Sequence, residues 1–117
     1  MAQVTGIGGV FFRSADPKAL AEWYDRHLGV KAGESPWMQE AGPTVFAPFP
    51  ADSEYFPAAR QFMLNFRVDD LPGLLIALDA AGVATETRAE WDGPYGSFAR
   101  IFDPEGNPIE LWQPPAE

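Results

Sequence analysis

An internal repeat is the feature that most constrains how this chain can fold. The segment GVFFRSADP, residues 9–17, aligns with MLNFRVDDL, residues 63–71, at a constant offset of 54. The matched positions include three identical pairs: Phe12 with Phe66, Arg13 with Arg67, and Asp16 with Asp70. In both halves the aspartate is followed by apolar residues at helical spacing and then by Gly-Val. Self-similarity of this kind predicts two matching structural units.

Each unit is expected to open with a strand and to continue into a helix. Alternate residues of the opening segments are apolar, which is the period of a strand. Asp16, followed by Pro17, and Asp70 are good N-cap residues. Gly29 and Gly82 stand where each helix is expected to end. The apolar stripes that should pack on the strands are Leu20, Trp23, Tyr24 and Leu28, and then Leu71, Leu74, Leu75 and Leu78.

Short strands separated by glycine and proline turns follow each helix. They are expected near residues 30–32, 37–39 and 44–49, and again near residues 83–88, 98–102 and 108–113. The turn DPEGNP predicts a hairpin connection, because Pro104 presets a turn and Gly106 and Asn107 tolerate positive φ. The predicted fold class is α+β, with one domain over residues 1–117. In it, β-α-β-β-β units 1–56 and 61–117 form a curved mixed sheet around a cleft.

Composition limits the possible classes of function. A chain of 117 residues suffices for one domain, and the lack of cysteine excludes disulfides, thiolate nucleophiles and cysteine-based zinc sites. Eight basic and 17 acidic residues give a net charge of -9, which repels nucleic acid and anionic membranes. No secretory signal or membrane-spanning apolar run is visible. We therefore expect a cytoplasmic protein with neither a nucleic-acid nor a membrane partner.

Three segments occur in an order typical of one superfamily: GIGGVFFRSADPKALAEWYDRHLGV, FRVDDLPGLLIALDAAGV and YGSFARIFDPEGNPIELWQP. Together they cover more than half of the chain. They resemble the vicinal oxygen chelate superfamily, which includes glyoxalases, extradiol dioxygenases, fosfomycin-resistance enzymes and bleomycin-resistance proteins. The resemblance implies a glyoxalase-like fold. It also implies a homodimer, because small members commonly complete their clefts between or beside chains.

The same resemblance implies where metal ligands would stand. In metal-using members these positions lie on the first and last strand of each unit, and here they fall on Gly9, Ala47 or a neighbour, Met63 and Glu110. Only Glu110 could bind a divalent ion, which needs about three or four nitrogen or oxygen ligands. The lone histidine, His27, is interpreted as a surface cation at a helix C-terminus. No cofactor is therefore predicted, with an atypical divalent metal site as the alternative.

The alternation of side chains along each strand, here called strand parity, predicts which residues line the cleft. An apolar and aromatic wall with a few polar groups is typical of small-molecule sites. The predicted ligand-binding residues are Phe11, Arg13, Trp37, Met63, Asn65, Arg67, Tyr95, Phe98, Arg100 and Trp112, with Tyr55 and Trp91 as further aromatic residues of nearby loops. The alternative interpretation is structural: the arginines pair with Glu110 or other acids, and the aromatic residues fill the cleft or form a dimer interface.

Glu110 is the candidate catalytic residue. Four roles are open to it: a general acid or base without metal, one ligand of a metal, a hydrogen-bond acceptor for a ligand, or the partner of an arginine. The favoured function is metal-independent binding of a small organic ligand in an aromatic cleft, as the bleomycin-resistance branch implies. The alternatives are a lyase, isomerase or dioxygenase-type enzyme that uses Glu110, and an interaction module whose cleft is filled by its own side chains.

Overall fold

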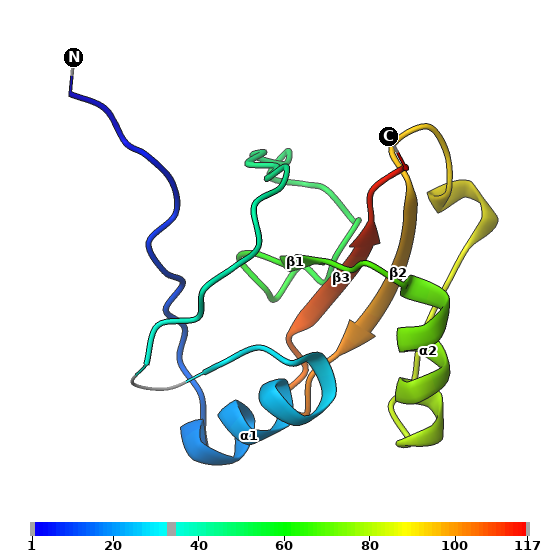
Figure 1. Ribbon diagram of the computed structural model, residues 1–117, viewed down its shortest axis with the longest axis horizontal. Helices are drawn as coiled ribbons and strands as arrows, with labels where there is room; N and C mark the ends of the chain where they lie inside the picture. Colours follow the sequence, from blue (N-terminus) through cyan, green and yellow to red (C-terminus); the bar gives the residue numbers. More distant parts are fainter. Residues whose placement is uncertain (1, 33–34, 117) are drawn as a thin grey trace.

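The computed structural model describes residues 2–32 and 35–116. In chain order the elements are α1 (Pro17–Leu28), β1 (Leu64–Arg67), α2 (Leu71–Ala80), the 3-10 helix η1 (Ala89–Trp91), β2 (Ser97–Phe102) and β3 (Pro108–Gln113). Figure 1 shows these elements around one small sheet, while the N-terminal residues run away from it as an extended trace. Among the described helices, none has the length and apolar character needed to cross a membrane. The chain is an α+β fold.

The three strands form an open mixed sheet in the order β1-β3-β2 (Figure 1). β3 pairs in parallel with β1 and antiparallel with β2, so that Leu111 lies between Phe66 and Ala99. The strand expected near residues 83–88 is reduced to a single bridge between Glu86 and Arg100. The strand that carries Glu110 is therefore the centre of the sheet.

Both helices begin at the predicted caps. Asp16 accepts a hydrogen bond from the backbone N of Ala19 at 3.2 Å, and Asp70 accepts one from the backbone N of Gly73 at 3.1 Å. Gly29 follows α1 in the left-handed region at φ 67°, which glycine adopts without the steric penalty of a Cβ. These contacts are local in sequence, and this is why the pattern of residues was sufficient to predict them.

The core lies on one face of the sheet, under both helices. Its buried side chains are Leu20, Tyr24, Leu71, Leu78, Ala99, Ile101, Ile109 and Leu111. Leu20 and Tyr24 belong to α1, so the helix of the first half packs on the sheet of the second half. This differs from the expectation that each helix packs on the strands of its own unit. Each fully buried leucine or isoleucine contributes about 1.5–3 kcal/mol through removal from water.

The turn DPEGNP joins α1 to the sheet through Asp103, which is 4% exposed. Its carboxylate accepts hydrogen bonds from the Tyr24 hydroxyl at 2.7 Å, from the Glu105 backbone N at 2.9 Å, and from the backbone N and Nδ2 of Asn107 at 3.0 and 2.8 Å. Gly106 has φ 82°, as the turn requires. Burial, reinforced by Asp103, raises the pKa of Tyr24 far above its ordinary value, so the phenol stays a donor.

The first half lacks the strands that the repeat predicts. Within the described residues that precede β1, no strand forms near 9–13, 30–32, 37–39 or 44–49. Large apolar side chains are left in water there, with Val4 89%, Phe11 94% and Phe46 86% exposed. A strand needs a hydrogen-bonded neighbour, and Gly6, Gly8 and Gly9 weaken the preference for extended pairing. The repeat therefore appears in the helices and not in the strands.

Candidate functional site

The sheet face turned away from the helices carries the polar residues of the candidate site. The register places Glu110 between Asn65 and Arg100. Two residues further along β3, Trp112 lies between Arg67 and Phe98. Side chains of alternate strand residues share a face, and the facing residues of paired strands lie on the same side. Strand parity therefore predicted correctly that these six residues share one face.

Arg100 is the most buried polar residue of this face, at 7% exposed. Its guanidinium lies over two aromatic rings, 5.0 Å from the centroid of Tyr55 and 5.7 Å from that of Trp91. Nη2 donates to the backbone O of Tyr55 at 2.9 Å, whereas buried Nε has no hydrogen-bond partner within the described part of the chain. Aromatic faces stabilise a desolvated cation, but an unpaired buried donor costs about 1–3 kcal/mol. The site thus holds an unused hydrogen-bond donor.

Both oxygens of the Glu110 carboxylate accept hydrogen bonds from neutral groups. Oε2 accepts from the hydroxyl of Tyr55, and Oε1 accepts from Nδ2 of Asn65 at 2.7 Å. The two ion pairs found among the described residues join Lys31 to Asp25 and Arg88 to Glu86. The interpretation in which an arginine pairs with Glu110 is therefore wrong for this structure. Register places Arg100 opposite Glu110, but its guanidinium turns to the aromatic rings instead.

Tyr55 connects the two charged residues. It comes from the segment between α1 and β1, and its ring lies 6.3 Å from that of Trp91 and 5.8 Å from that of Phe49. Desolvation, with the hydrogen bond to Glu110, raises the pKa of Tyr55 to about 12. The phenol is therefore protonated at neutral pH and donates a hydrogen bond to the carboxylate.

A second aromatic group lies beside this cluster. Phe98 and Trp112 stack with centroids 6.1 Å apart and an interplanar angle of 5°. The indole Nε1 of Trp112 donates to the backbone O of Tyr95 at 2.8 Å, which leaves the Tyr95 side chain 77% exposed. The stacked rings of Phe98 and Trp112, together with Tyr55 and Trp91 around Arg100, give the face an aromatic character with a few fixed polar atoms.

Arg67 lies on the same face, but its guanidinium is hydrogen-bonded to the backbone of residues 40–43. Its guanidinium donates to the backbone oxygens of Pro43 and of Glu40, the latter at 2.8 Å. Gly42 makes room for this contact, because a Cβ at that position would lie 3.0 Å from the Arg67 guanidinium. Arg67 therefore orders residues 40–44 against the sheet.

The remaining predicted residues lie elsewhere. Phe11 is almost fully exposed, and Trp37 packs edge-on against Phe66, whose strand neighbours belong to the core side. Arg13 lines a different cavity, described below. Met63 immediately precedes β1 and is half-buried. Their predicted contact with a ligand stays a prediction.

A metal ion does not fit the donor set of this face. The positions that the resemblance implies for ligands hold Gly9, Ala47 or a neighbour, and Met63 beside Glu110, and both oxygens of Glu110 are already hydrogen-bonded. Within residues 2–32 and 35–116, no three histidine, aspartate or glutamate side chains come together as metal ligands would. One carboxylate alone does not hold a divalent ion against water.

Sequence reasoning missed the pairing of Tyr55 with Glu110 and of Trp91 with Arg100. Both aromatic residues were recognised as neighbours of the cleft, but nothing in the segments that carry them gives their position on the sheet. A short motif could not supply the first pairing, because Tyr55 and Glu110 are 55 residues apart. Trp91 and Arg100 are close in sequence, but the irregular segment between them does not fix how the indole lies against the guanidinium.

Comparisons with known proteins agree with this architecture. A profile described as the glyoxalase-like domain matches residues 9–112. Among solved structures, TnmS3, an antibiotic-binding protein from Streptomyces sp. CB03234, matches with a TM-score of 0.61 at 24% sequence identity, over 98% of this chain and 100% of that chain. Curated protein sequences contain no significant match to this chain. At this identity the structural likeness shows a common fold.

Proposed function

This chain belongs to the glyoxalase-like domain family of the vicinal oxygen chelate superfamily, and from that premise we propose that it binds a small planar organic molecule beside Arg100 without a metal ion. One observation carries the proposal: the buried guanidinium of Arg100 lies over the rings of Tyr55 and Trp91, and its Nε has no hydrogen-bond partner among residues 2–32 and 35–116. Structural residues rarely leave a buried donor unused, whereas binding sites hold polar groups ready for a ligand.

The chemistry of the face indicates what such a ligand carries. Asn65 is exposed and can donate and accept, Glu110 accepts, and Arg100 donates. Phe98 and Trp112 are stacked, and because Trp112 is only 9% exposed, the half-buried ring of Phe98 supplies the apolar part of the face. A fused aromatic compound with a hydroxyl or amine group matches both features. The description of TnmS3 as antibiotic-binding supports a binding role of the same general kind.

Tyr55 is placed to make way for the ligand. Its segment, residues 49–61, contains neither helix nor strand, so the phenol can leave Glu110 without disturbing the sheet. A hydroxyl of the ligand would then take the place of the phenol on Glu110. Metal independence belongs to the same proposal and is supported by the missing ligands at Gly9, Ala47 and Met63. Elemental analysis of protein purified without chelator would contradict it by finding a stoichiometric transition metal.

Calorimetry with naphthol and quinoline as probes tests the proposal. Binding should quench tryptophan fluorescence through Trp91 and Trp112, and Arg100→Lys should weaken it roughly tenfold, because lysine lacks the planar fork that stacks and donates. Arg26→Lys, on the exposed side of α1, is the matched control and should change nothing. Absence of heat with every probe, or equal affinities of the two variants, would reject the proposal.

The Tyr55–Glu110 hydrogen bond favours a second candidate, proton transfer in a metal-free lyase or isomerase. A phenol that shares a proton with a carboxylate is a suitable acid–base pair. In this case Glu110→Gln and Tyr55→Phe should each abolish turnover of a substrate while leaving its affinity within a few-fold. Turnover that survives Glu110→Gln would exclude this role.

We also propose a homodimer in which the extended segments of the first half complete a second sheet with a partner chain. The exposure of Val4, Phe11 and Phe46 supports it, because a partner chain that covered these large apolar side chains would remove them from water. Light scattering after size exclusion should give twice the chain mass. Phe46→Ser should lower that mass, whereas Tyr95→Ser, also exposed but in the second half, should not. The mass of one chain at high concentration would contradict the dimer.

A further inference from the structure

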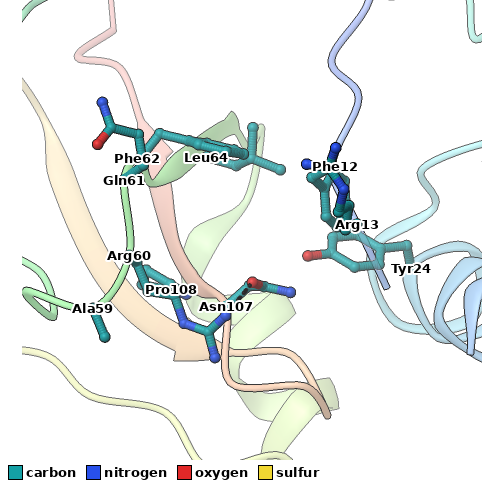
Figure 2. A pocket seen from close by; sticks show the side chains of 10 residues that line it. All are labelled: Phe12, Arg13, Tyr24, Ala59, Arg60, Gln61, Phe62, Leu64, Asn107 and Pro108. Atoms are coloured by element: carbon teal, nitrogen blue, oxygen red, sulfur yellow. Dashed lines mark hydrogen bonds between the residues drawn. The ribbon is translucent and has the colours of Figure 1, made fainter. Parts of the chain in front are cut away.

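We propose that a cavity distinct from the Glu110 face binds a small organic carboxylate with an apolar body. The cavity has a volume of about 200 Å³. Figure 2 shows Phe12, Arg13 and Tyr24 on one side of it, and Arg60, Phe62 and Asn107 on the other. Glu110, Arg100 and Tyr55 take no part in its lining. The inference is therefore independent of the binding function proposed above.

Two arginines set the charge of this cavity. The chain has 17 acidic and only eight basic residues, yet Arg13 and Arg60 line the cavity and no carboxylate does. Arg13 is exposed and forms no ion pair with any described residue. Arg60 donates Nη1 to Oδ1 of Asn107 at 3.2 Å and Nη2 to the backbone O of Glu105 at 2.9 Å. Both of its acceptors are neutral and no carboxylate belongs to the lining, although the charge of Glu105 outside it interacts with that of Arg60.

Two carboxylates of the adjoining DPEGNP turn, those of Glu105 and Asp103, accept hydrogen bonds from other donors. Glu105 accepts from the hydroxyl of Ser14 at 2.7 Å and from the backbone N of Ala15 at 2.9 Å. Asp103 is buried and accepts from Tyr24 and Asn107. Neither is available to pair with Arg13. A carboxylate brought by a ligand would therefore find paired N–H donors, the geometry that guanidinium groups use to recognise it.

The rest of the cavity is aromatic and small. The ring of Phe12 meets Tyr24 and Phe62 edge-on, at centroid distances of 6.4 and 6.5 Å. The hydroxyl of Tyr24 is bound to Asp103, so the cavity receives its ring rather than a free polar group. Sites for drug-sized ligands have volumes of roughly 300–1,000 Å³, so this cavity suits one ring or a short chain. An aromatic monocarboxylate matches the charge, the walls and the size.

Benzoate is the probe for an NMR titration of the whole chain. The backbone amide signals of Phe62 and Asn107 should move saturably, and Arg13→Gln should weaken binding roughly tenfold through loss of one charge-assisted contact. Arg26→Gln makes the same change of net charge outside the cavity and should leave the affinity unchanged. Arg60→Lys is a second variant, compared at an equal folded fraction because Arg60 also holds the turn.

Two further probes test whether binding needs both the carboxylate and the apolar body of the ligand. Benzyl alcohol tests the need for charge and inorganic phosphate the need for an apolar body; both should bind at least about tenfold more weakly than benzoate. The proposal is overturned if phosphate binds as tightly, if Arg13→Gln behaves like Arg26→Gln, or if benzoate moves the signals of Asn65 and Trp112 instead. Arg100→Lys should leave benzoate binding intact even where it removes naphthol binding, so the two proposals fail separately.

Discussion

The two halves of the chain share one sequence pattern and yet reach different structures. Their helix caps are almost identical, with φ/ψ of -141°/83° at Asp16 and -141°/84° at Asp70. The matched phenylalanines differ: Phe66 lies in β1 against the core, whereas Phe12 lies outside any strand and is 38% exposed. A cap needs a partner three residues away, while a strand needs one far along the chain. The comparison therefore separates local from non-local determinants of the fold.

The largest effect should come from the core of the second half. Leu111→Ala removes a fully buried side chain between β1 and β2 and should lower the free energy of unfolding by about 2–5 kcal/mol. Phe11→Ala, at a residue of the first half that is 94% exposed, should change it by less than about 0.5 kcal/mol in dilute solution. Chemical denaturation measures both. Equal losses would show that the first half is packed within a single chain.

The second-largest loss of stability should come from the hydrogen bond between Tyr24 and Asp103, which joins α1 to the turn of the second half. Asp103→Asn places an amide NH₂ against the donors of Tyr24 and Asn107, and unpaired buried donors cost about 1–3 kcal/mol. Tyr24→Phe removes one donor and leaves the carboxylate its other partners, so its loss should be the smaller of the two. The same denaturation experiment ranks them. If Tyr24→Phe proved more harmful than Asp103→Asn, the link between α1 and the turn would not depend on this carboxylate.

Removing either helix N-cap, Asp16 or Asp70, should lower stability by a similar amount. Asp16→Ala and Asp70→Ala each remove one side-chain acceptor from a helix N-terminus, with an expected loss of about 1 kcal/mol each. Thermal unfolding followed by circular dichroism gives the two values. A clear inequality would mean that tertiary contacts, and not the local pattern, determine one of these helix starts.

The smallest expected effect is the loss of folding stability at acidic pH through protonation of Glu105. Hydrogen bonds from Ser14, Ala15 and Asp16 lower the pKa of Glu105 below its usual 4.5. The charged form is thus favoured by folding, and this contribution is present above pH 4.5 and disappears as pH falls through the lower pKa of the folded state. Glu105→Gln should therefore be less stable than the parent at neutral pH, and the difference should vanish in acid. Glu90→Gln, exposed in η1, serves as control; a difference that persists in acid would contradict the assignment.

Much of the second half was predictable from residues alone. The strands near 98–102 and 108–113, both helices and the DPEGNP turn form as expected, because alternation, caps and turn residues all point to one structure. The shared face of Asn65, Arg100 and Glu110 followed from parity. The contact of Tyr55 with Glu110 could not be predicted in this way. Tyr55 lies in an irregular segment, whose residues do not alternate in a pattern that would place them on the sheet.

By itself, the sequence determined where the helices start and how the closing hairpin turns. The family resemblance added that Gly9, Ala47 or a neighbour, and Met63 stand where metal ligands would accompany Glu110. Only the tertiary structure decided that α1 covers the sheet of the second half, that Tyr55 binds Glu110, and that Arg13 joins Arg60 at a separate cavity. The first group depends on interactions within a few residues. The second depends on which distant surfaces exclude water together, and no local pattern specifies that choice.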